Sequence, residues 1–548
     1  MAGITTTTHS NCNFCSKLDE PGRFKLYEPC HSKSLCGDLC QACSNLEKLE
    51  GLIGDHIAEA KKALGDLLEQ HRRIREQMNS AHDPLVRKLP REVASYIFQL
   101  CMPVPSVEIG LEKWTKSEGT TPFVLAAVCK NWRRIALSTP HLWNFVSINF
   151  DAKGWRRNPY ESYEFVKQQL DRSGCLPLSI RLNAETPDDD IYFLDIVQTL
   201  CHLSYRWRAL EIRSHSCVFP LISGLAGAPS DLRSLRLLVP RRRAFDLPYE
   251  FRLPSAAPEE VVLANVILKS VDITWDRVTQ VHAIGLQALE CHEILRRAPR
   301  LKRCNLSVVD EILEWMGATP DYMVVHEALQ ELILGQIPTP SRVHLVLNKM
   351  TTPSLQHLTL GPSACLPKSP DVLRFLQRSS CLLKELVIDG LHVDAYNSSF
   401  EDVIDMLKKI PTLVRLDCSP SIRDNDLPNA LAKILRITSI PITSHCEQFL
   451  PMLETLKLKV FPKDDIHWEG IASIFGSLGE LHDPRRRPLR KVHVEYVPSQ
   501  VFRWSPSLYI DEDALLRMRC VLHAGLDLTV GDEASNYDFI EDSAKQHT

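Results

Sequence analysis

Short segments of the form Leu/Trp-x-x-apolar-x-apolar recur along most of this chain, and they restrict its possible folds more than any other feature. Two degenerate copies, PEEVVL from Pro258 and VTQVHA from Val278, fill the one wide gap in the series. The clear copies are WRALEI from Trp207, LRSLRL from Leu232, LKRCNL from Leu301, LQELIL from Leu329, LQHLTL from Leu355, LKELVI from Leu383, LVRLDC from Leu413, LETLKL from Leu453 and LRKVHV from Leu489. Between the copies at 301 and 413 the spacings are 28, 26, 28 and 30 residues (329−301, 355−329, 383−355, 413−383). A spacing this regular indicates one structural unit repeated along the chain.

Each unit is predicted to contain a strand followed by a helix. Within LKELVI the side chains alternate, so Leu386 and Ile388 point to one side and Val387 to the other. Between the copies, apolar residues recur three and four positions apart, as in DVLRFLQRSS before Leu383, and this spacing favours a helix. The expected fold class is therefore α/β, with a parallel sheet lined by helices.

The pattern and its period resemble leucine-rich repeats, which implies a solenoid of parallel strands and helices over residues 170–530. A strict repeat of that family carries Asn or Cys three residues after the last strand leucine, but Pro240 and Leu391 occupy that position here. We therefore expect an irregular leucine-rich-repeat solenoid. An ordinary doubly wound α/β domain is the alternative.

A second set of motifs precedes the repeats, within residues 89–143: LPREVASYIFQLCMP, and then FVLAAVCKNWRRIALSTPHLW. They resemble the F-box, and most closely the F-box-like proteins that are abundant in mushroom-forming fungi. The resemblance implies a small all-α F-box-like domain over residues 83–150, which binds the Skp adaptor. The stretch 102–122, rich in Pro, Gly and polar residues, is interpreted as a loop insertion in this domain. The residues on matching positions, and so the expected adaptor-binding residues, are Leu89, Pro90, Val93, Ile97, Phe98, Val128, Cys129, Trp132 and Trp143.

The same segment has a physical interpretation that does not depend on the resemblance. Pro90 is suited to the start of a helix, and Val93, Ile97 and Leu100 then form one apolar stripe. Two short amphipathic helices cannot bury both of their faces in so small a unit, so a partner surface is expected to cover the remainder. The alternative is that these helices only cap the repeat array.

Cysteine is concentrated at the N-terminus, where six of the 18 lie within residues 1–43. Two pairs have the C-x-x-C spacing with which two thiolates bind one tetrahedral zinc ion. The hypothetical zinc ligands are Cys12, Cys15, Cys40 and Cys43, with Cys30, His31 and Cys36 as rivals. The alternative is a segment of reduced, structural thiols that binds no metal.

Two further segments flank these parts. Residues 44–80 carry a long apolar stripe opposite charged residues, which predicts one amphipathic helix suited to a coiled coil or to docking on the F-box-like unit. The last residues, 531–548, are acidic, and we expect a flexible tail there.

Composition and motif content narrow the functional classes. The net charge of −4, from 64 basic and 68 acidic residues, favours no nucleic-acid partner, and the arginine runs at 241–243 and 485–487 are interpreted as solvated faces. No apolar run is long enough to span a bilayer, and no signal peptide is apparent, so we expect no membrane partner and an intracellular location, cytoplasmic or nuclear. The chain carries no phosphate loop, H-E-x-x-H motif or recognisable catalytic cysteine signature, so it is not expected to be an enzyme.

The two resemblances together imply the substrate-recognition subunit of a Skp-cullin-F-box ubiquitin ligase. In that role the F-box binds the Skp adaptor, and through it a cullin, while the repeats bind a target protein that the sequence does not identify. The alternative is a leucine-rich-repeat interaction scaffold with no ligase role, in which the F-box-like segment is a structural cap.

Overall fold

The computed structural model divides into two compact units, which we call the helical unit (Met1–Phe98 and Phe123–Ala136) and the sheet unit (Gln99–Pro122 and Leu137–Thr548). Within them the structure describes residues 41–82, 88–102, 121–150, 158–184, 191–225, 231–240, 250–308, 322–335, 343–361, 369–391, 400–420, 426–440, 448–460, 468–496, 510–532 and 537–546.

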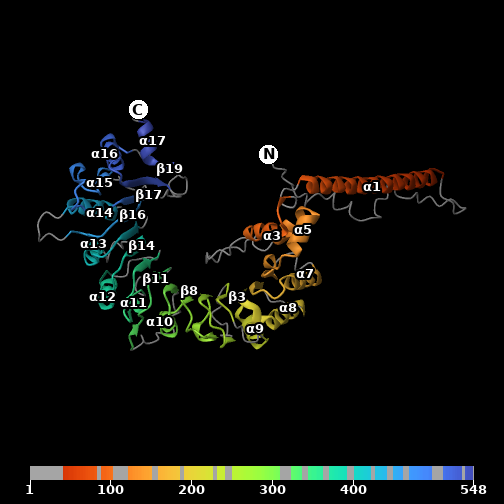
Figure 1. Ribbon diagram of the computed structural model, residues 1–548, viewed down its shortest axis with the longest axis horizontal. Helices are drawn as coiled ribbons and strands as arrows, with labels where there is room; N and C mark the ends of the chain where they lie inside the picture. The colour runs from red at the N-terminus through yellow and green to blue at the C-terminus, as the bar shows by residue number, and fades with distance from the viewer. Residues whose placement is uncertain are drawn as a thin grey trace. The chain divides into compact units, whose positions relative to one another are not determined.

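The helical unit is built from helices α1 (Gln41–His82), α3 (Arg91–Leu100), α4 (Thr121–Val128) and α5 (Lys130–Leu137), of which α3 and α5 each end just beyond it (Figure 1). Helix α1 confirms the long helix predicted over residues 44–80. Helix α3 begins directly after Pro90, whose carbonyl accepts from the Ala94 N–H at 3.1 Å. A proline suits this place because its fixed φ and missing N–H cost nothing before the first helical turn.

The sheet unit contains one large sheet whose strands follow each other in sequence order. A doubly wound sheet reverses its strand order at a switch point, and this sheet does not. Neighbouring strands are parallel, except that β18 and β19 are antiparallel. The order is β1 (Phe145–Asn149), β2 (Leu178–Ala184), β3 (Trp207–Ser214), β4 (Ser234–Leu238), β6 (Glu260–Ala264), β8 (Gln280–Leu286), β9 (Arg303–Val308), β11 (Glu331–Leu334), β13 (His357–Leu360), β14 (Glu385–Leu391), β15 (Arg415–Pro420), β16 (Thr455–Val460), β17 (Lys491–Tyr496), β18 (Asp527–Asp532) and β19 (Tyr537–Asp538).

Helices connect most of these strands and lie along one side of the sheet (Figure 1). Between β4 and β8, short strands take the place of helices: β5 (Phe251–Leu253) pairs with β7 (Val271–Ile273). A second small pair joins β10 (Val324–Val325) to β12 (Met350–Thr351). The helices are α7 (Pro159–Arg172), α8 (Ile191–His202), α9 (Phe219–Leu225), α10 (Ala288–Arg297), α11 (Val343–Leu347), α12 (Ser369–Ser379), α13 (Phe400–Lys408), α14 (Asp426–Ile437), α15 (Trp468–Ala472), α16 (Glu512–His523) and α17 (Phe539–Gln546). Short 3-10 turns lie at Pro140–Leu142, Ser204–Arg206, Ser216–Val218, Leu268–Ser270 and Leu478–Glu480.

A continuous hydrophobic core fills the space between the sheet and its helices. Alternate strand residues point into it, and register aligns them in rows: Leu358 pairs with Leu332 on one side and with Leu386 on the other, and all three are fully buried. Each such side chain contributes about 1.5–3 kcal/mol on full burial. The first leucines of the predicted repeats are buried in the same way: Leu232, Leu301, Leu329, Leu355, Leu383, Leu413, Leu453 and Leu489.

The strands predicted from the repeats are confirmed, because each of the eleven segments, degenerate copies included, overlaps a strand of the large sheet. The sheet also extends beyond the expected range of 170–530. Strand β1 lies within the segment assigned to the F-box-like domain, 83–150, and pairs with β2 because its alternate residues Val146 and Ile148 are buried in the core.

The expectation of a flexible acidic tail over 531–548 is corrected for its described part. Strand β19 and helix α17 lie there, and Ile540 of α17 is buried in the core. The Asp538 carboxylate accepts from the Ile540 N–H at 2.9 Å at the start of this helix. At least one acidic residue of the segment, Asp538, therefore caps a helix. From the sequence alone, a capping aspartate looks the same as a solvated one.

The interpretation of residues 485–487 as a solvated face is also corrected. Arg485 is exposed and pairs with Asp483 at 2.8 Å, but Arg487 is 2 % exposed. The Arg487 guanidinium donates to main-chain oxygens around the end of α14, at 2.6–3.1 Å. The four acceptors are the carbonyls of Leu435, Thr438, Phe449 and Leu450. The run at 241–243 lies outside the described residues.

Candidate protein-binding surfaces

The helical unit has a small core in which α3 packs on α5. Phe98 is 1 % exposed, and its ring centroid lies 4.8 Å from that of Trp132 at an interplanar angle of 47°. Ala94, one turn earlier on α3, is also buried, as is Ile135 on α5. The main-chain N–H of Trp132 donates to the Cys129 sulfur at 3.4 Å, where α4 ends and α5 begins. Tilted ring packing of this kind gives an aromatic pair about 0.5–1.5 kcal/mol beyond its buried area.

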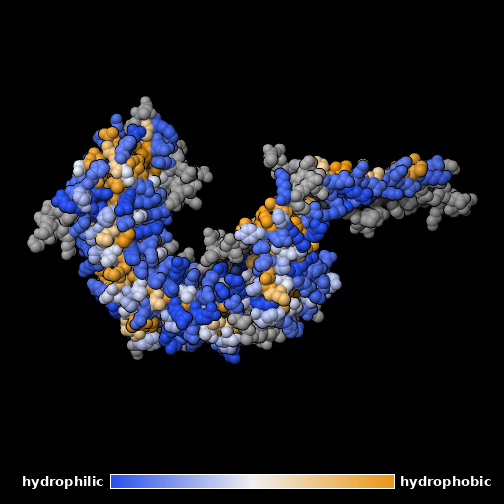
Figure 2. Space-filling model, viewed as in Figure 1, coloured by the Kyte–Doolittle hydropathy of each residue, from blue (hydrophilic) through white to orange (hydrophobic). Residues whose placement is uncertain are grey.

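The outer sides of α3 and α4 expose large apolar side chains. On α3, Val93 and Tyr96 are 41 % and 60 % exposed, and on α4, Val124 and Val128 are 60 % and 45 % exposed. Within each helix these pairs are three or four residues apart, so each pair lies on one face. Figure 2 shows apolar residues at the surface in the region of α3. Exposed apolar residues gathered on one element are typical of a surface that another protein covers.

The structure divides the expected adaptor-binding residues between this surface and the interior. Val93 and Val128 are exposed, Pro90 is exposed at the start of α3, and Leu89 and Ile97 are half-buried, as is Trp132. Tyr96 and Val124 are exposed on the same surface but are not among the residues that the resemblance indicates. The spacing could have found both, because Tyr96 is three residues after Val93 and Val124 is four residues before Val128.

Phe98, Cys129 and Trp143 are corrected to packing residues. Each is buried, with exposed fractions of 1 %, 8 % and 0 %. Trp143 belongs to the sheet unit, where the Arg172 guanidinium lies 4.9 Å from its ring centroid. The burial of Phe98 has a simple cause, because a unit as small as the helical unit needs its large apolar side chains for its own core.

The sheet unit offers a second surface, the face of the sheet that points away from the buried rows. Its side chains are half-exposed and largely polar, and oppositely charged pairs join neighbouring strands across it. Arg181 and Glu211 are paired in register at 3.1 Å on β2 and β3. Further pairs follow along the sheet: Arg236–Glu260 at 2.9 Å, Arg303–Glu331 at 3.2 Å, His357–Glu385 at 2.8 Å, Arg415–Glu385 at 3.3 Å, Lys457–Glu495 at 3.0 Å and Lys491–Asp527 at 2.9 Å.

These cross-strand pairs contribute little to the stability of the fold, because partly exposed ion pairs contribute about 0–1 kcal/mol each. Their main effect is to place charges at fixed positions on the surface of the sheet. The densest group lies on β15–β17. Lys457 and Lys459 both approach Glu495, at 3.0 and 3.8 Å. Burial raises the pKa of the neighbouring Asp417 carboxyl, and the positive charges of Lys457 and Lys459 oppose that shift. A face that carries charges of both signs in a fixed order suits the recognition of a polar protein surface.

Four thiols of the sheet unit, those of Cys201, Cys291, Cys304 and Cys418, belong to its core. Burial raises the pKa of Cys201 and Cys304 to about 12, and it also raises the pKa of Cys291 and Cys418. A nucleophilic cysteine needs the opposite shift, so these four are packing residues.

The expected zinc site falls almost entirely outside the described residues. Cys12, Cys15 and Cys40 lie there together with the rivals Cys30, His31 and Cys36, and of Cys43 only the backbone is described, at the start of α1. Within the described ranges, no group of three or more His, Cys, Asp or Glu side chains is placed to hold a metal ion. None of the helices described there combines the length and the apolar character needed to cross a bilayer.

Comparison with protein-family models finds no family that matches the chain, and comparison with curated proteins finds no match either.

Proposed function

We propose that this chain is the substrate-recognition subunit of a Skp-cullin-F-box ubiquitin ligase. The helical unit is then an F-box that binds the Skp adaptor, and the sheet unit is a leucine-rich-repeat solenoid that binds the target protein. The chain performs no chemistry in this role. It holds a lysine of the target near a charged ubiquitin-conjugating enzyme, so that a bimolecular reaction proceeds as if it were intramolecular.

The observation that carries the proposal is the exposure of apolar side chains on α3 and α4. Val93, Tyr96, Val124 and Val128 are 41–60 % exposed, while the core of the same unit is closed by Phe98 on Trp132. A unit with a complete core and a remaining apolar surface is suited to a permanent or frequent protein partner.

The sequential parallel sheet supports the second half of the proposal. Its open face carries paired charges in register along many strands, whereas its other face is closed by the core. A solenoid presents such a face as one extended surface, which is how repeat proteins bind large targets.

Co-expression with the Skp adaptor, followed by size-exclusion chromatography, tests the docking. The informative variants are Val93→Asp and Val128→Asp, since both side chains are exposed and neither change disturbs the core. Each is expected to weaken adaptor binding by about 30-fold, because a buried interface anchor contributes about 2 kcal/mol. Val325→Asp is the matched control, because Val325 is 61 % exposed on β10 of the sheet unit.

Co-elution of the wild type and the control, lost in both variants, supports the proposal. If the wild type and the adaptor elute separately, the docking proposal is wrong. The helical unit is then a structural cap, and the chain is an interaction scaffold without a ligase role. If all four proteins co-elute equally, the adaptor binds elsewhere on the chain.

A further inference from the structure

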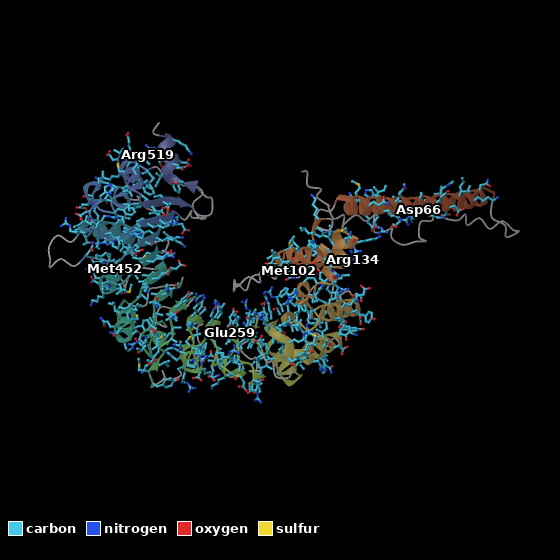
Figure 3. All side chains as sticks on the ribbon, in the orientation of Figure 1. Asp66, Met102, Arg134, Glu259, Met452 and Arg519 are labelled. Atoms are coloured by element: carbon cyan, nitrogen blue, oxygen red, sulfur yellow. The ribbon has the colours of Figure 1, made fainter. Side chains whose placement is uncertain are left out.

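Helix α1 exposes a row of large apolar side chains along its length. Among them are Ile57 at 51 %, Leu64 at 57 %, Leu67 at 62 % and Ile74 at 49 % exposed. Apolar residues are visible at the surface of α1 in Figure 2, and side chains extend from both sides of its ribbon in Figure 3, where Asp66 is labelled. An isolated helix in water is only marginally stable, and most helices in proteins are stabilised by packing of an apolar face. A helix of 42 residues with an exposed apolar row is therefore expected to pack against a partner.

The row follows a seven-residue period. With the usual heptad letters, four successive a positions and four successive d positions fall on one seam, and only two of the eight, Ala60 and His71, are not large and apolar. The a positions are Ile57, Leu64, His71 and Met78, and the d positions are Ile53, Ala60, Leu67 and Ile74. A repeat sustained over this many heptads is the pattern of a two-stranded coiled coil.

The Arg–Glu and Lys–Glu ion pairs that the structure describes on α1 lie on the opposite side of the helix. Glu76 pairs with Lys130 of α5 at 2.8 Å, and this hydrogen bond lowers the pKa of the Glu76 carboxyl. Glu69 pairs with Arg72 and Arg73 along the helix, at 2.6 and 3.0 Å. All four residues of α1 named here occupy b, c or f positions. Among the described residues, the helix therefore meets α5 with its polar side, and the large apolar residues of the seam are exposed.

We infer that the occupant of this seam is α1 of a second copy of the chain, in antiparallel orientation. Pairing a positions with d positions so that the two residue numbers sum to 131 gives four kinds of layer, each of which occurs twice in the symmetric dimer. Large residues then meet large ones, and His71 meets the small Ala60. The layers are Ile57 with Ile74, Leu64 with Leu67, His71 with Ala60, and Met78 with Ile53, each joining one copy to its partner.

The flanking positions favour the same orientation. In the antiparallel dimer Lys61 lies beside Leu68 of the other copy, whose apolar surface its aliphatic stem covers. A parallel, in-register dimer would pair His71 with His71 of the other copy and Ala60 with Ala60 of the other copy. One layer of the core would then be too polar, and another would be too small to fill the space. It would also place His56 beside Lys61, two groups without opposite charge, and the e and g positions between residues 53 and 78 hold no acidic residue that could pair with either.

A membrane surface is a poorer occupant. Over residues 41–82 the helix carries seven acidic residues (47, 50, 55, 59, 66, 69, 76) and six basic ones (48, 61, 62, 72, 73, 75). Helices that lie on anionic bilayers have a polar face rich in Lys and Arg, and this helix has no such excess.

Multi-angle light scattering of the full-length chain tests the stoichiometry. The wild type is expected to have twice the mass of one chain at micromolar concentration. Leu64→Asp with Leu67→Asp is expected to weaken the dimer by at least about 100-fold, because it places four carboxylates in the two central layers. Leu52→Asp is the matched control: Leu52 is 56 % exposed but occupies a c position, so its dimer is expected to persist.

A photo-crosslinking amino acid in place of Ile74, in a mixture of isotope-labelled and unlabelled chains, tests the orientation. The antiparallel dimer predicts crosslinks between labelled and unlabelled chains at the peptide that contains Ile57. A monomeric wild type, or crosslinks only within one chain, would overturn the inference. Crosslinks from position 74 to position 74 of the other copy would overturn it too, because they indicate a parallel dimer. None of these outcomes depends on adaptor binding.

Discussion

A guanidinium that is buried is stable only where protein oxygens replace the water that it loses, and in the sheet unit the buried Arg206 and Arg487 and the half-buried Arg378 all donate to main-chain oxygens. Arg206 donates to the Leu176 carbonyl at 2.9 Å, and Arg378 donates to the Leu347 carbonyl at 2.6 Å. Arg487 bonds four carbonyls near the end of α14. Leu347 ends α11 and Leu435 lies in the last turn of α14, where helix carbonyls have no partner within the helix, so Arg378 and Arg487 satisfy such carbonyls and offset the negative end of the helix dipole.

Arg487 is therefore expected to contribute far more to stability than its neighbours in the run of three arginines. Burial lowers its pKa to about 10, so it remains charged at neutral pH. Arg487→Met leaves several buried carbonyls without a donor, and we expect the free energy of unfolding to fall by at least about 3 kcal/mol. Chemical denaturation measures this, with Arg485→Met as the control, which is expected to change stability by less than about 0.5 kcal/mol. Equal losses in the two variants would contradict the structural role of Arg487.

The sequence could not distinguish these arginines. Residues 485–487 are three identical side chains, and only the fold places one of them beneath the end of α14. The candidate adaptor surface was likewise only partly predictable from the sequence. The stripe on α3 could be predicted from spacing, but which residues of the motif it buries depends on how α3 meets α5, and Phe98 of that motif is in the core.

At the scale of elements, the ends of the strands hold neighbouring repeats at a fixed distance. The Ser214 hydroxyl donates to the Ala184 carbonyl at 2.7 Å, and the Asn265 side-chain amide donates to the Val239 carbonyl at 2.9 Å. Each bond reaches back from the end of one strand to the end of the preceding one. Asn265 adopts a positive φ of 56°, which Asn tolerates better than most residues.

Gly285, at the end of the next strand, makes room for this arrangement. Its φ is +81°, and a Cβ there would lie 2.5 Å from the Asn265 side-chain oxygen. Gly285→Ala is expected to lower the free energy of unfolding through both backbone strain and loss of the Asn265 bond. Gly174→Ala is the control for strain alone, because Gly174 has a φ of +58° and no atom within 4 Å of the added Cβ. We expect the control to cost about 1–2 kcal/mol and Gly285→Ala at least about 1 kcal/mol more, by thermal or chemical denaturation. Indistinguishable losses would show that the close approach to Asn265 has no energetic consequence.

The strands could be predicted from the sequence because alternate residues are buried, which gives an apolar pattern of period two, as in LKELVI and LQELIL. The connections between the strands were harder to predict. Between β4 and β8 the chain forms β5 and β7 instead of helices, in a stretch where Pro254 and Pro258 interrupt any helical spacing. Strand β1 was missed because it stands alone before the first recognisable repeat and gains its core position only by pairing with β2.

At the scale of the whole molecule, the chain combines two units with different surfaces. The helical unit exposes apolar side chains on α3 and α4, and the sheet unit exposes paired charges on its open face. Apolar anchors give affinity, whereas ordered charges give selectivity and faster association. This division fits a protein that binds one constant partner through the first unit and a chosen target through the second.

Hydrogen–deuterium exchange of the full-length chain, alone and with the Skp adaptor, tests this account most directly. We predict that the adaptor slows exchange over residues 91–100 and 121–137, where α3, α4 and α5 lie, and leaves exchange in the strands of the large sheet unchanged. Slowed exchange in those strands, with no change in α3 to α5, would contradict the account.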